Sequence, residues 1–183
     1  MGELHRSIKS EEDQEQYFES VYERYRIAEE SADKELHYFT IAGFRVCLRF
    51  AGSHMVEIMT PALNHLRVDA FDNPDLTLCV WDSESTGVEM VPHPVGIEDF
   101  TDRGDIWGFY SSRFKTAFHW SDFSVNVMDL QRGSGFSWLR PQADFLTGST
   151  LRHYGRCFTG GWSRKAFSLY MRQLSAPTME QCW

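Results

Sequence analysis

The sequence lacks the signals that would direct the chain into or across a membrane. No stretch approaches the ~18 consecutive apolar residues of a membrane span, and the first residues, MGELHRSIKSEEDQ, contain no apolar segment typical of a signal peptide. Met1 and Gly2 begin like a myristoylation signal, but Arg6 stands where that signal needs Ser or Thr. We therefore expect a cytoplasmic protein that does not associate with membranes.

Cysteine is scarce. The 183 residues include four cysteines, and no two of them have the CxxC spacing of a metal or redox motif. Cys47 and Cys79 lie inside apolar runs that are typical of strands. A buried thiol behaves as a small hydrophobic side chain, and free thiols are usual in reducing compartments. We predict that both thiols are buried and reduced, which agrees with a cytoplasmic location.

A basic surface is also missing. Lys and Arg number 18 against 26 Asp and Glu, so the net charge is −8, and the electrostatic footprint of a nucleic-acid-binding protein is absent. The charge is uneven, since residues 1–40 hold 11 acids and 5 bases whereas residues 131–183 hold 2 acids and 7 bases. Such asymmetry indicates an extra segment at each end. We predict an acidic helical extension over 1–36, an α+β domain over 37–146 and an atypical tail over 147–183.

Motifs that carry nucleotide, metal or hydrolase chemistry are absent as well. The sequence contains no GxxxxGK[ST], GxGxxG, HExxH or GxSxG pattern. The GSG sequence at 133–135 predicts a turn, because a phosphate loop would also need a lysine and a following helix. Three aspartates between residues 99 and 105 do not follow the DxDxDG pattern of a calcium loop. We expect no cofactor, no metal site and no ATP binding.

What the sequence has in quantity is aromatic side chains, with 14 Phe, 7 Tyr and 6 Trp. An aromatic excess is typical of a sheet-rich core, and it would also suit an aromatic-lined ligand cleft. Residues 11–31 predict an amphipathic helix, because apolar side chains recur at i, i+1, i+4, i+5 and i+8 on one face. This face either docks on the domain or forms an exposed partner surface. Its members are Tyr17, Phe18, Val21, Tyr22 and Tyr25.

The rest of the chain predicts strands with one or two helices. The runs 37–41 and 44–50 predict two strands joined by a tight hairpin or interrupted by a bulge, with period-two alternation in the second. The apolar run 76–82 predicts a central strand buried on both faces. A helix is expected from Ser53 to about Leu66, kinked or ended at Pro61. Further short strands are predicted over 106–110, 115–120, 123–128 and 136–139.

The predicted fold class is therefore α+β, with a mixed or antiparallel sheet, one or two packed helices and an N-terminal helix. A candidate binding segment follows the predicted central strand. Ligands collect outside the carboxyl ends of strands in open α/β sheets, and hydroxyl groups beside a glycine can bind an anion. The alternative is a capped Asx or Ser turn. The segment consists of Trp81, Asp82, Ser83, Ser85, Thr86 and Gly87.

Four stretches carry a resemblance to a known family. They are YFTIAGFRVCLRFAG (38–52), TPALNHLRV (60–68), PDLTLCVWDSESTG (74–87) and, more weakly, FSVNVMDL to GFSWLR (123–140). The chain resembles, over these stretches, the N-terminal region of HPr kinase/phosphorylase-related, serine kinase-like bacterial proteins, which often accompany peptide-modifying enzymes. In that family a Gly-rich phosphate loop follows downstream. The resemblance implies a non-catalytic domain, truncated before the nucleotide site, that helps hold a protein or peptide partner.

The residues after about Gly148 do not continue the resemblance in frame. Read in a frame shifted by one base, the same codons are compatible with the family's sequence. At some positions the genetic code allows only one residue: His153-Tyr154 must give Leu and Met179-Glu180 must give Gly. We interpret this tail as an out-of-frame translation of a longer kinase-like gene. The alternative is a short natural homologue with its own C-terminus.

Two other functions remain open from the sequence. One is a small stand-alone enzyme or ligand-binding protein with an aromatic-lined cleft, using His119, Asp122 or the 81–87 segment at its mouth. The other is an interaction module that uses the acidic N-terminal helix, provided that the Tyr and Phe side chains of that helix are exposed.

Overall fold

The computed structural model describes residues 9–92, 105–119 and 124–140. The chain divides into two compact units, 1–142 and 143–183, and the second lies wholly outside the described residues. Residues 11–31, which form the N-terminal helix, belong to the same compact unit as the strands of the sheet.

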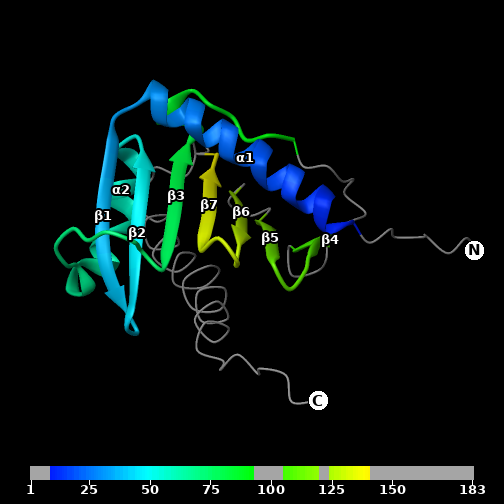
Figure 1. Ribbon diagram of the computed structural model, residues 1–183. Helices are drawn as coiled ribbons and strands as arrows, with labels where there is room; N and C mark the ends of the chain where they lie inside the picture. The colour runs from blue at the N-terminus through cyan, green and yellow to red at the C-terminus, as the bar shows by residue number, and fades with distance from the viewer. Residues whose placement is uncertain (1–8, 93–104, 120–123, 141–183) are drawn as a thin grey trace, which may run out of the picture. The chain divides into compact units, whose positions relative to one another are not determined.

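The described strands form a seven-stranded mixed sheet in the order β1-β2-β3-β7-β6-β5-β4 (Figure 1). Strand β2 runs parallel to β3 and β3 runs parallel to β7, whereas the other neighbouring pairs are antiparallel. This arrangement confirms the predicted α+β class. The strands are β1 (Lys34–Ile41), β2 (Phe44–Ala51), β3 (Leu76–Asp82), β4 (Asp105–Tyr110), β5 (Phe114–His119), β6 (Ser124–Asp129) and β7 (Ser134–Leu139).

Strands β1 and β2 form the tight hairpin that was one of the two predicted alternatives. Ala42 and Gly43 connect them, with φ angles of 52° and 90°. Positive φ at both central residues is characteristic of a two-residue hairpin turn whose twist matches that of the flanking strands. The turn sets the register of the two strands, so that Tyr38 lies opposite Cys47 and Leu36 lies opposite Arg49.

Helix α1 (Glu11–Ser31) begins at a capping box, in which the Ser10 hydroxyl accepts from the Asp13 N–H and the Asp13 carboxylate accepts from the Ser10 N–H. The helix packs its aromatic face on the sheet. The Phe18 ring lies 5.1 Å from that of Phe136, and the Tyr25 ring lies 5.9 Å from that of Trp81. The helix therefore covers the aromatic centre of the sheet.

This packing corrects the expectation of an exposed partner surface on the helix. Tyr17, Phe18, Val21 and Tyr25 are all buried, because they supply the helix side of the hydrophobic core. Tyr22 is the exception, since it lies at the edge of the helix–sheet contact and is 42% exposed. The aromatic face is thus used within the chain, as the docking alternative required.

The connection between β2 and β3 is helical as predicted, and the first helix ends just before Pro61, which was one of the two predicted alternatives. It contains α2 (His54–Met59) and then a 3-10 helix, η1 (Pro61–Leu66). The Ser53 side chain makes no capping hydrogen bond, so it is not the N-terminal signal that we expected. Pro61 instead opens the second helix, where its missing N–H costs nothing.

Cys47 and Cys79 are both buried and unbonded, as predicted. None of the helices in the described ranges is long and apolar enough to cross a membrane.

Candidate functional site

The segment that the sequence proposed as a binding site leaves β3 at the edge where β2 and β7 also end. It forms a single short turn of helix, α3 (Ser83–Thr86). Asp82 is fully buried at its start, and its carboxylate accepts hydrogen bonds from the Ser85 N–H at 2.8 Å and from the Ser85 hydroxyl at 2.6 Å. Both carboxylate oxygens are therefore engaged within the segment itself.

The other polar side chains of the segment also have partners within the chain. The Trp81 indole N–H donates to the Val88 carbonyl at 3.1 Å, and the Ser83 hydroxyl accepts from the Trp138 indole at 2.9 Å. The Thr86 hydroxyl donates to the Asp82 carbonyl. These bonds tie the segment to β7 and to its own backbone.

Gly87 closes the turn in the left-handed conformation, with φ 70°, and its N–H donates to the Ser83 carbonyl at 2.9 Å. The structure thus brings together all six residues that the sequence singled out. It does so as a capped turn, the alternative stated above, in which the polar side chains of the segment bond to one another, to nearby backbone and to Trp138 of β7.

We predict that Asp82→Ala lowers the free energy of unfolding by about 1–2 kcal/mol, because the variant loses a helix cap and leaves the Ser85 N–H without its acceptor. Urea denaturation measures the change. The matched control is Glu84→Ala, an exposed acid in the same turn, which we expect to change stability by no more than about 0.5 kcal/mol. If Asp82→Ala were neutral or stabilising, the carboxylate would not be acting as a cap.

A second surface lies on the β1–β2 hairpin. We call it the hairpin face, and it consists of Leu36, Tyr38, Arg45, Cys47, Arg49 and Phe71. The cross-strand pairs of the hairpin place five of these side chains on one face of the sheet. Phe71, from the segment after η1, packs edge-on against the Tyr38 ring at 5.1 Å and lies beneath the Arg45 guanidinium at 5.8 Å.

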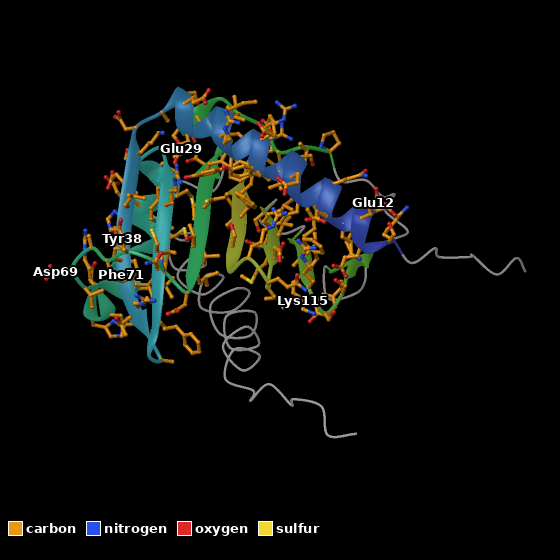
Figure 2. The ribbon with its side chains drawn as sticks, viewed as in Figure 1. Glu12, Glu29, Tyr38, Asp69, Phe71 and Lys115 are labelled. Atoms are coloured by element: carbon orange, nitrogen blue, oxygen red, sulfur yellow. The ribbon has the colours of Figure 1, made fainter. Side chains whose placement is uncertain are left out.

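The hairpin face remains partly open to solvent. Leu36 is 49% exposed, the highest value among the described aliphatic side chains of the sheet, and Tyr38 and Phe71 are half-buried. Figure 2 shows the labelled Tyr38 and Phe71 side by side next to β1. An aliphatic, two aromatic and two guanidinium side chains thus adjoin, a composition enriched at protein interfaces.

Ion pairs fix the cations of this face. The Arg49 guanidinium binds both oxygens of the Glu29 carboxylate, and Arg45 pairs with Asp75 at 3.6 Å. Burial alone would favour protonated Glu29, but hydrogen bonds from Arg49 and Lys34 outweigh it and hold the pKa of Glu29 below its usual value. The same pairing raises the pKa of Arg49. The face therefore carries charge but little net charge.

The thiols nearby are poor nucleophiles. Burial raises the pKa of Cys79 to about 12, and it also raises the pKa of Cys47. Because the thiolate is the reactive form, both cysteines remain protonated at neutral pH.

Other residues named from the sequence cannot be placed at a site. Asp122 lies outside the described residues, as does the side chain of His119. Within the described ranges, no group of three or more His, Cys, Asp and Glu side chains has the arrangement of a metal site.

Comparison with known proteins identifies no relative of this chain. No family model, no curated protein and no solved structure matches the chain. The resemblance to HPr kinase-related proteins therefore stays a prediction that depends on the four sequence stretches.

Proposed function

We propose that the described unit is a non-catalytic domain of an HPr kinase-related protein that binds a protein or peptide partner through the hairpin face. The observation that carries this proposal is the unequal covering of the sheet. Helix α1 packs on β2, β3, β5, β6 and β7, whereas Leu36 and Tyr38 of β1 lie on the same sheet face and remain accessible. Adjoining apolar and aromatic side chains at the surface favour a partner.

The hydrogen bonds at the carboxyl ends of the parallel strands favour a partner site elsewhere on the unit. The carboxyl edge of the parallel strands is the usual ligand site in such sheets, but here Asp82, Ser83 and Thr86 direct their hydrogen bonds into their own turn and toward β7. A partner would instead meet Tyr38, Phe71 and the paired guanidinium of Arg45. Tyrosine and arginine are among the residue types enriched at the energetic centres of protein interfaces.

We also propose a cytoplasmic location, which the two buried free thiols support.

A further part of the proposal is that the chain is encoded by a longer kinase-like gene. Reading the coding DNA in the adjacent frame tests that part: a GKS codon run within about 15 codons after Trp183 is expected from the position of the phosphate loop in the family. Its absence would leave the partner-binding role without the family assignment.

A selection experiment tests the binding role. The immobilised full chain is used to select from a displayed library of random peptides, and the affinities of the selected peptides are measured. We expect Leu36→Asp to weaken their binding at least about tenfold, the effect of losing a central apolar contact.

Ile27→Asp is the matched control, since Ile27 is 47% exposed but lies on α1, outside the hairpin face. It should leave the affinities within about twofold, as expected for a position outside the interface. The proposal fails if the selected peptides bind Leu36→Asp as tightly as they bind the unaltered chain. It also fails if the two variants weaken binding equally.

A further inference from the structure

An ion-pair cluster joins the N-terminal half of α1 to the sheet. At its centre is Arg113, in the turn between β4 and β5, whose side chain is only 12% exposed. Its guanidinium contacts the fully buried Asp129 carboxylate at 2.8 Å, the Glu15 carboxylate at 2.8 Å and the Glu11 carboxylate at 3.2 Å. One arginine therefore bridges two helix acids to one strand acid.

Arg132, in the turn between β6 and β7, extends this cluster. It contacts Glu15 at 2.7 Å and Asp129 at 3.4 Å, and it also pairs with Glu19. The cluster then holds two guanidinium groups against four carboxylates. Lys115, from β5, is engaged with the Ser111 carbonyl and the Tyr110 ring. Among the described residues, the polar contacts that add to the aromatic packing of this half are thus ion pairs, with more carboxylates than guanidinium groups.

Beneath this half of the helix, two polar side-chain atoms of the described residues are buried without a hydrogen-bond partner. They are the Gln14 side-chain oxygen and the Tyr17 hydroxyl, and their side chains belong to residues that are 4% and 6% exposed. A buried polar atom without a partner favours any state in which water reaches it. Docking of the N-terminal half therefore carries a cost that the ion pairs offset.

The C-terminal half of α1 is attached differently. The Tyr25 hydroxyl donates to the Arg49 carbonyl at 3.1 Å, and the Ser31 hydroxyl donates to the Thr86 carbonyl at 3.0 Å. Glu29 is held by Arg49 and Lys34. Here the polar groups have partners, and two of the bonds end on the backbone of the sheet and of the turn after β3.

From this contrast we propose that residues 11–20 of α1 form a flap that opens separately from the rest of the helix, with the Arg113–Arg132 cluster as its latch. Opening hydrates Gln14 and Tyr17 and uncovers the rings of Phe18 and Phe114, which pack on each other at 5.9 Å when the flap is closed. The part from Tyr25 onward stays docked. Such partial opening is the usual behaviour of segments whose attachment is weaker than that of their neighbours.

Amide hydrogen exchange of the full chain, read by mass spectrometry, tests the proposal. Without any substitution, the amides of residues 15–21 should exchange faster than those of residues 25–31. Glu15→Gln, which weakens the contacts to both arginines, should speed exchange over 15–21 about tenfold and change exchange over 25–31 less than about twofold.

The matched control is Glu23→Gln, which removes an exposed pair with Arg26 on the same helix and should change neither segment. Raising the salt concentration should act like Glu15→Gln on the unaltered chain, since salt screens ion pairs. If the two segments exchange at equal rates or respond equally to Glu15→Gln, the helix opens as one piece and the proposal is wrong. The proposal is equally wrong if Glu15→Gln leaves exchange over 15–21 unchanged.

Discussion

Asp129→Ala is expected to lower the free energy of unfolding by about 3–5 kcal/mol, the range seen when one partner of a buried ion pair is removed. Asp129 is fully buried at the end of β6 and accepts hydrogen bonds from the Arg113 guanidinium and from the N–H groups of Gln131 and Arg132. The substitution leaves the nearly buried Arg113 without its strand carboxylate and leaves two backbone donors unpaired. Urea denaturation at neutral pH measures the loss.

The control for this variant is Glu30→Ala, which removes an exposed pair with Arg26. Exposed pairs contribute little, so we expect a change below about 1 kcal/mol. Equal losses in the two variants would show that burial of Asp129 carries no energetic weight.

The pH dependence of stability provides a second measurement on the same residue. Burial alone would favour protonated Asp129, but hydrogen bonds from Arg113 and from the backbone of Arg132 and Gln131 hold its pKa below the ordinary 3.8. A hydrogen bond from Arg113 likewise lowers the pKa of Glu15. A lowered folded-state pKa contributes stability that is present above the unfolded value and is lost as the pH falls through the folded one. Stability should therefore fall below about pH 4, and it should fall less steeply in Asp129→Ala.

Gly52→Ala should destabilise the chain by about 2–4 kcal/mol, through two effects that act together. Gly52 has a φ of 84°, a backbone conformation that residues with a Cβ rarely adopt. An added Cβ would also overlap the Ser85 hydroxyl and lie 3.1 Å from the Ser85 Cβ. The Ser85 side chain cannot turn away freely, because its hydroxyl and its N–H both donate to the Asp82 carboxylate. The end of β2 and the turn after β3 thus fit only around a glycine.

Gly43→Ala separates the two effects. Gly43 also has a positive φ, of 90°, but an added Cβ would meet no atom within 4 Å, so we expect a loss of about 1–2 kcal/mol from the backbone alone. Ser85→Ala should recover part of the additional loss in Gly52→Ala by removing the hydroxyl. If Gly52→Ala and Gly43→Ala lose the same amount, the close approach between Gly52 and Ser85 does not limit the fold.

The elements with strong periodicity could be predicted from the sequence. Helix α1 spans residues 11–31 as predicted, and β3 spans residues 76–82, because a continuous apolar stripe or run marks both of them. Strand β1 begins at Lys34, three residues before the predicted start. Its first residues pair with β2 in register, but they are exposed on one face and so show no apolar alternation.

The candidate sites were harder to predict. The sequence from Trp81 to Gly87 is compatible with both an anion site and a capped turn. Which of the two forms depends in part on Trp138, which contacts Ser83 from β7, 55 residues along the chain. The pairing of Arg113 with Asp129 and Glu15 has no local signal, because its partners come from elements up to 98 residues apart. Nor does the sequence show that α1 leaves Leu36 of β1 exposed, since this depends on where the helix crosses the sheet.

The position of β7 has a consequence for the order of folding during synthesis. β7 lies between β3 and β6, yet of the strands described it is the last to be made. Until the ribosome has released residue 139, β3 and β6 each present an open edge, and unpaired edges are prone to incorrect association. The β1–β3 and β4–β6 parts of the sheet therefore join through β7 only once that late strand has left the ribosome.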